Sequence, residues 1–79
     1  MAQYERTLDA KGLTCPLPLL KVRQSLSDMC TDDVLHIEAT DPGSWRDFES
    51  FVAQAGHALL RQEERDGVFY YSIAKGAGR

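Results

Sequence analysis

Two segments with helical spacing of apolar residues alternate with segments of strand character, and this order limits the fold more than any other feature. Segment 16–29 repeats apolar residues at intervals of three and four, which predicts a helix with one buried face. That face comprises Leu19, Val22, Leu26 and Met29. Segment 44–55 has the same spacing and is followed by Gly56, a residue typical of helix ends, so it predicts a second helix.

The remaining segments have strand character. Segment 4–8 predicts a first strand, and 34–40 alternates apolar and polar residues as a half-buried strand does. Segments 57–65 and 68–74 flank Asp66-Gly67, a pair that suits a two-residue hairpin turn. The order is therefore β-α-β-α-β-β. Because crossovers between parallel strands are right-handed, we predict an α+β two-layer sandwich with both helices on one face of a mixed four-stranded sheet.

The chain is short and mildly acidic. Its 79 residues predict one domain, 1–79, in which 75–79 form a flexible tail. Nine Lys and Arg against twelve Asp and Glu give a net charge of −3, which disfavours direct nucleic-acid binding. An apolar stretch of about 18 residues and the pattern of a signal peptide are both lacking, so we expect a cytoplasmic protein without membrane contact. We also expect a monomer.

Cys15 is the candidate reactive residue. It lies between the first predicted strand and the first predicted helix and is followed by Pro16 and Pro18. We expect Cys15 at the N-cap and Pro16 at the first helical position, where the positive end of the helix dipole lowers a thiol pKa below about 8.5. Cys30, at the opposite end of that helix, is expected to be the less reactive thiol.

The two prolines also restrict the chemistry of this helix start. They have no N–H, which leaves Leu17 as the only donor among the first three helical residues and disfavours an oxyanion or phosphate site. Sulfur exchange needs mainly an accessible thiolate that a rigid backbone segment holds in place. The competing interpretation is that Cys15 is a small buried apolar residue, as unpaired cysteines often are.

Other sites receive less support from the sequence. Cys15 and Cys30 are separated by about 20 Å of helix, beyond the reach of a disulfide. His36 and His57 complete no ligand set with either cysteine, so no metal site is expected. Ser44 followed by Asp47 resembles a capping box at the start of the second helix.

The segment from Thr7 to Pro18, which contains Cys15-Pro16-Leu17-Pro18, resembles the signature of the TusA/SirA/YedF family of small sulfur-carrier proteins. The likeness continues through Lys21, Arg23, the Thr40-Asp41-Pro42 turn, Asp47 and the final hairpin. It implies a fold like the C-terminal domain of bacterial translation initiation factor three. It also implies that Cys15 carries sulfane sulfur as a persulfide, without a metal or organic cofactor.

In this family, sulfur passes from a protein donor such as a cysteine desulfurase or rhodanese to an acceptor thiol, for tRNA thiolation, sulfur oxidation or molybdenum-cofactor metabolism. Asp9, Gly12, Pro16 and Pro18 are then expected to shape the loop around Cys15. Lys11, Leu13, Lys21 and Arg23 are candidates for partner docking, although the charged ones have the alternative of being simply solvated. The alternative function is a non-catalytic adaptor or regulatory module in which Cys15 is only a packed helix cap.

Overall fold

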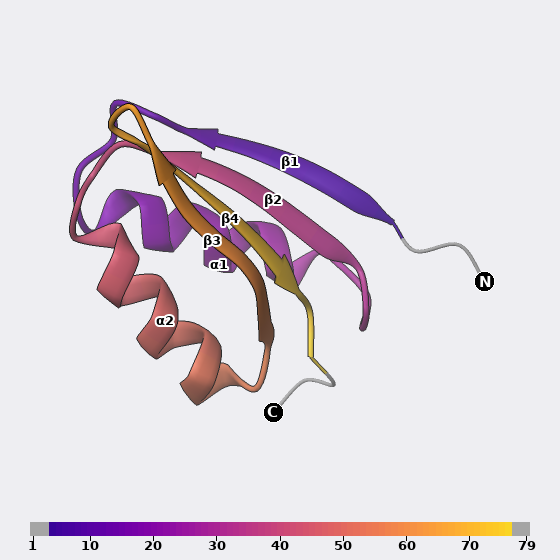
Figure 1. Cartoon of the computed structure of the whole chain (residues 1–79). Coiled ribbons are helices and arrows are strands. Elements are labelled where there is room, and N and C mark those ends of the chain that lie inside the picture. Colours follow the sequence, from indigo (N-terminus) through magenta and orange to yellow (C-terminus); the bar gives the residue numbers. More distant parts are fainter. Residues whose placement is uncertain (1–3, 77–79) are drawn as a thin grey trace.

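The computed structural model describes residues 4–76 and has the predicted order of elements (Figure 1). The elements are β1 (Glu5–Ala10), α1 (Leu17–Ser27), β2 (Val34–Ala39), α2 (Ser44–Ala55), β3 (Ala58–Arg65) and β4 (Val68–Ala74). Both helices cover one face of the sheet, which confirms the α+β sandwich. The first strand ends at Ala10 rather than Leu8, because its pairing with β2 continues to Ala39.

The sheet has the order β1-β2-β4-β3. β1 and β2 are parallel, whereas β4 pairs antiparallel with both β2 and β3. Asp66 and Gly67 join β3 to β4 with φ angles of 54° and 84°, as the predicted hairpin turn requires. Since parallel strands end at the same edge of a sheet, the loops that follow Ala10 and Ala39 emerge side by side. This edge carries the candidate site.

The core lies between the sheet and the two helices. The predicted alternation in β2 is confirmed, because Leu35, Ile37 and Ala39 all point into the core. The helices and β4 add Val22, Leu26, Phe48, Val52, Tyr71 and Ile73, and Met29 joins the core just after α1, which ends at Ser27 rather than at Met29 as expected. Apolar burial at about 25 cal/mol per Å² therefore holds α1 and α2 against the sheet.

The first two residues of the expected tail at 75–79 form contacts with the rest of the fold. The Lys75 ammonium donates hydrogen bonds to the carbonyls of Leu26 at 2.6 Å and Met29 at 2.8 Å, at the C-terminal end of α1. The Gly76 N–H donates to Nδ1 of His57 at 2.9 Å. The rest of the expected tail, 77–79, lies outside the residues that the structure describes.

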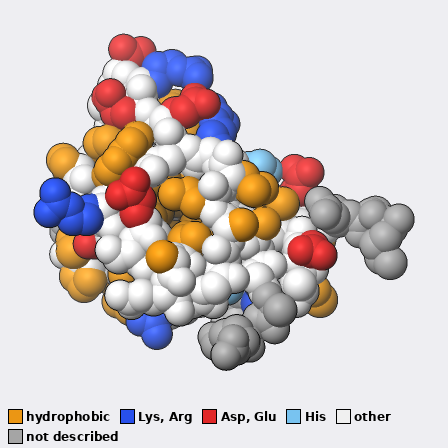
Figure 2. Space-filling view, turned by 60° about the horizontal axis from the view of Figure 1, so that its bottom comes forward, with side chains coloured by type: hydrophobic (Ala, Val, Ile, Leu, Met, Phe, Trp, Pro, Cys, Tyr) orange, Lys and Arg blue, Asp and Glu red, His pale blue; other side chains and the backbone are white. Residues whose placement is uncertain are grey.

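The surface carries charges of both signs. On the face shown in Figure 2, acidic and basic side chains are intermixed, with hydrophobic side chains between them. Within residues 4–76, no helix is long and apolar enough to cross a membrane.

Candidate functional site

Cys15 lies in the loop between β1 and α1 and is exposed. The expected N-cap at this residue is wrong, because α1 begins one residue later, with Pro16 at the N-cap and Leu17 and Pro18 as its first residues. The Pro16 carbonyl accepts from the N–H of Leu20, while the Leu17 N–H is bonded to the Thr14 carbonyl. The Leu17 amide, which lies between the two prolines, is therefore occupied by a backbone carbonyl.

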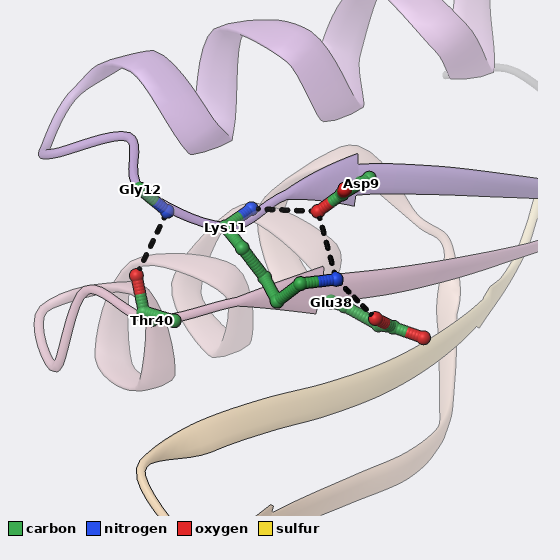
Figure 3. Close-up of polar contacts among 5 residues, drawn as sticks. All are labelled: Asp9, Lys11, Gly12, Glu38 and Thr40. Atoms are coloured by element: carbon green, nitrogen blue, oxygen red, sulfur yellow. Dashed lines mark hydrogen bonds and ion pairs between the residues drawn. The ribbon is translucent and has the colours of Figure 1, made fainter.

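The loop that presents Cys15 is attached to the end of β2 (Figure 3). The Gly12 N–H donates to Oγ1 of Thr40 at 3.0 Å, and Gly12 has a φ of +85°, which glycine adopts without the cost that a Cβ adds. The Lys11 ammonium pairs with Asp9 at 3.1 Å and with Glu38 at 2.7 Å. Asp9 also accepts the Lys11 N–H. These contacts fix the loop at Gly12 and on its N-terminal side.

The polar partner of the Cys15 sulfur is Asp47, in the first turn of α2. The Cys15 thiol donates to Oδ2 of Asp47 at 3.3 Å. This hydrogen bond raises the pKa of the exposed Cys15 thiol above its ordinary value, and partial desolvation and the charges of Asp47 and Asp41 act in the same direction. The expected lowering of the Cys15 pKa is therefore wrong: a carboxylate, rather than a row of helix amides, faces the sulfur.

The predicted capping box is also wrong. Gly43 is the N-cap of α2, and no side chain caps this helix. The Ser44 hydroxyl instead forms a buried hydrogen bond of 2.7 Å with the Tyr71 hydroxyl, while the Asp47 carboxylate reaches Cys15. The sequence pattern thus identified two polar side chains at a helix start but assigned them the wrong partners.

The expected support residues divide into surface and core. Pro16 is exposed at the start of α1, whereas Pro18 is fully buried. Pro18 therefore belongs to the buried face of α1 as well as restricting the first helical turn.

The expected docking residues do not all present free groups to a partner. Leu13 is partly buried and packs against the core, and Lys11 is held by Asp9 and Glu38. Lys21 is exposed on α1. Arg23 is also exposed, but it lines a hollow of about 220 Å³ together with Leu26, Ser27, Phe51, His57 and Lys75, at the other end of α1 from Cys15.

Sequence reasoning missed two exposed apolar residues beside Cys15. Leu17 and Leu20 are each 45% exposed and lie in the first turns of α1. Their signal was present in the sequence, since both are leucines that fall off the predicted buried face of the helix. They offer an apolar contact to a macromolecule that approaches the sulfur.

The remaining reactive side chains are separate from this site. Cys15 and Cys30 are both unpaired. His36 lies between Ser72 and Glu5 on β2, with ring nitrogens 2.8 and 3.0 Å from their oxygens. Within the described part of the chain, no group of three or more His, Cys, Asp and Glu residues is placed to hold a metal ion.

Comparison with known proteins gives the family of this chain. The model of the sulfurtransferase TusA family matches residues 6–75. The chain belongs to the TusA family. It is 45% identical to the sulfur carrier protein TusA of Allochromatium vinosum, over 95% of this chain and 99% of the relative. It is 39% identical to the sulfur carrier protein TusA of Pseudomonas entomophila, over 94% of this chain and 92% of the relative.

A solved structure shows the same fold. The SirA-like protein of Desulfitobacterium hafniense superimposes with a TM-score of 0.80, over 90% of this chain and 97% of that one, at 23% sequence identity. The resemblance identified from the Cys-Pro-x-Pro segment is thus confirmed at the level of family and fold.

Proposed function

We propose that this protein is a sulfur carrier in which Cys15 holds sulfane sulfur as a persulfide and passes it to an acceptor thiol of another protein. The observation that carries the proposal is the exposed Cys15 thiol in the β1–α1 loop. The Gly12–Thr40 and Lys11–Glu38 contacts attach this loop to β2 and its C-terminal end. Membership of the TusA family and the names of the relatives support it.

The chemistry needs two exchanges at sulfur. In loading, the Cys15 thiol gives its proton to solvent, and the thiolate attacks the terminal sulfur of a donor persulfide. The bond between the two donor sulfurs breaks, and its electron pair leaves on the donor as a thiolate. In delivery, an acceptor thiolate attacks the terminal sulfur on Cys15, the sulfur–sulfur bond breaks, and Cys15 leaves as a thiolate that takes up a proton. The sulfane sulfur changes carrier without a net redox change.

The partners are proteins in this proposal, because the site is a surface loop rather than an enclosed cavity. Leu17 and Leu20 supply apolar contact area next to the thiol, and Lys21 supplies an exposed charge on the same helix. A cysteine desulfurase or a rhodanese is the donor class, and the acceptor belongs to tRNA thiolation, sulfur oxidation or molybdenum-cofactor metabolism. We place the carrier in the reducing cytoplasm, where two unpaired thiols persist.

The non-catalytic adaptor is the weaker alternative. It requires Cys15 to be a packed helix cap, whereas the thiol is exposed and lies outside the N-cap. The adaptor predicts that Cys15→Ser keeps full activity in the cell.

Mass spectrometry tests the carrier directly. The protein is incubated with a cysteine desulfurase, cysteine and pyridoxal phosphate, and we expect a gain of about 32 Da that reduction removes. Cys30→Ser is the matched control and should gain the same mass, while Cys15→Ser should gain none. Persistent absence of the mass gain in the unsubstituted protein, with desulfurase and rhodanese donors alike, contradicts the proposal.

A further inference from the structure

The contact between Cys15 and Asp47 opposes the chemistry proposed for the site. Both loading and delivery pass through a state in which the Cys15 sulfur carries negative charge. The Asp47 carboxylate lies 3.3 Å from this sulfur and favours the protonated thiol. The Asp47 carboxylate therefore disfavours the Cys15 thiolate. The negative charge of Asp47 must be compensated for sulfur transfer to be fast.

The ion pairs of residues 4–76 do not supply that compensation. Among residues 4–76, neither Asp47 nor Asp41 forms an ion pair with a lysine, arginine or histidine. Arg46 neighbours Asp47 in sequence but forms no bond with it. Lys11, the nearest basic residue before Cys15 in the chain, is held by Asp9 and Glu38.

The surface beside Asp47 is open. A hollow of about 450 Å³ is lined by Pro42, Gly43, Trp45, Arg46 and Asp47. Asp47 thus faces the Cys15 thiol and also borders space that a side chain from another molecule can enter. The acidic character next to the sulfur is complementary to a cation.

We propose that Asp47 is a positioning residue that restrains Cys15 until a donor or acceptor protein places a lysine or arginine side chain against the Asp47 carboxylate. The inference rests on the proposed carrier function and specifies how docking activates the site. In the free protein, the thiol keeps its proton and reacts slowly with small electrophiles. In the complex, the partner's cation pairs with Asp47, and the Cys15 thiolate forms at lower cost.

The first test uses charged thiol reagents and needs no sulfur donor. In a Cys30→Ser background, Cys15 reacts with neutral methyl methanethiosulfonate and with its cationic trimethylammonium-ethyl analogue. The cationic reagent brings its own compensating charge to Asp47. We expect Asp47→Asn to lower the ratio of cationic to neutral rates about fivefold, the factor for one pair of unit charges about 4 Å apart in water. Asp47→Glu should retain most of the ratio.

Asp47→Asn should also react faster with the neutral reagent at pH 7. The gain is about three- to fourfold for each unit by which the pKa of Cys15 falls, because a less basic thiolate is more abundant but intrinsically less nucleophilic. Glu49→Gln is the matched control, since Glu49 has the same charge, lies on the same helix and is exposed. Equal ratios in Asp47→Asn and Glu49→Gln would overturn the inference.

The second test uses loading by a cysteine desulfurase, read by mass. If the partner's cation pairs with Asp47, Asp47→Asn should raise KM for the carrier while kcat does not fall. A fall in kcat at unchanged KM would show that Asp47 is a general base for Cys15, and no change in either would show that the partner does not contact it. Both results contradict the inference. A failure of the unsubstituted protein to load sulfur contradicts the proposed function instead, and the reagent ratios still measure the effect of Asp47.

Discussion

Ser44 and Tyr71 join α2 to the sheet through a buried hydrogen bond of 2.7 Å between their hydroxyl oxygens. Each residue is 1% exposed. Ser44 is the first residue of α2, and Asp47 follows three residues later on the same turn. The Tyr71 hydroxyl therefore anchors the helix start that carries the Asp47 carboxylate to Cys15.

Replacement of Tyr71 by phenylalanine tests this anchor. The Ser44 hydroxyl is then buried without its partner, and the free energy of unfolding should fall by about 1–3 kcal/mol. Urea denaturation measures the loss. The double variant Ser44→Ala/Tyr71→Phe should lose less than the sum of the two single variants, because neither hydroxyl remains unpaired. Simple additivity would mean that the hydrogen bond does not couple α2 to β4.

Gly12 tests the presentation of Cys15 separately from overall stability. Gly12→Ala should cost about 1–2 kcal/mol, because φ of +85° is unfavourable for a residue with a Cβ, although a Cβ there would meet nothing within 4 Å. Gly67→Ala is a matched control with a φ of +84° and equally open surroundings, far from Cys15 in the β3–β4 turn. Both variants should lose similar stability in urea, but only Gly12→Ala should slow sulfur loading. Equal loading rates would show that the loop conformation at Gly12 does not matter for transfer.

A substitution at Lys75 tests whether this residue contributes to the stability of the fold. Lys75→Met removes a charged donor from the carbonyls of Leu26 and Met29 at the C-terminal end of α1, where a cation is also favoured by the helix dipole. The free energy of unfolding should fall by about 1–3 kcal/mol in urea denaturation. Lys21→Met, an exposed lysine on the same helix, should change it by less than about 0.5 kcal/mol. If both variants changed the free energy of unfolding by a similarly small amount, Lys75 would belong to the flexible tail.

Most of the fold could be predicted from the sequence because its signals are local. The apolar spacing in 16–29 and 44–55, the alternation in 34–40 and the Asp66-Gly67 turn each correspond to an element of the structure. The exact start of α1 could not be predicted in this way. Cys15 suits the N-cap and Pro16 suits the first helical position, but the start depends on which carbonyl accepts the first helical hydrogen bond, and in the structure this is the Pro16 carbonyl.

The reactive residue of the site could be predicted from the sequence, but the contact of its thiol could not. Cys15 and its prolines form a compact local motif, whereas the partner of the thiol is 32 residues away in sequence. An aspartate near the start of a helix is also expected as a helix-capping residue. Its position in the sequence therefore does not indicate a contact with Cys15. The direction of the Cys15 pKa shift depends on this distant contact. A local argument from the helix dipole therefore gave the wrong sign.

Lys21 and Lys11 should differ in their effect on transfer to a protein. Lys21 is exposed and free for a partner, whereas Lys11 is engaged by Asp9 and Glu38. Lys21→Gln should therefore slow transfer more than Lys11→Gln, and the difference should shrink as salt shortens the screening length from about 10 Å. Single-turnover transfer at several salt concentrations measures this. A larger, salt-sensitive loss in Lys11→Gln would reassign the docking charge to the β1 loop.

His57 gives the protein a pH dependence with a defined sign. Burial lowers the pKa of His57 below its ordinary value, and the nearby charge of Lys75 lowers it further. Its Nδ1 atom accepts the Gly76 N–H, which only the neutral ring can do. As pH falls below about 6.5, the unfolded chain takes up a proton on His57 that the folded protein does not. The free energy of unfolding should therefore fall with pH in this window, until the folded histidine also titrates.

The comparison with His57→Asn isolates this effect, because an asparagine oxygen can accept the Gly76 N–H and does not titrate. Urea denaturation between pH 7.5 and about 5 should show a smaller loss of stability in His57→Asn than in the unsubstituted protein. The control His36→Asn removes a histidine of β2 that contacts Glu5 and Ser72 rather than Gly76. A proton NMR titration should also place the His57 midpoint below 6.5. Parallel stability curves for the unsubstituted protein and His57→Asn would show that protonation of His57 is not linked to folding.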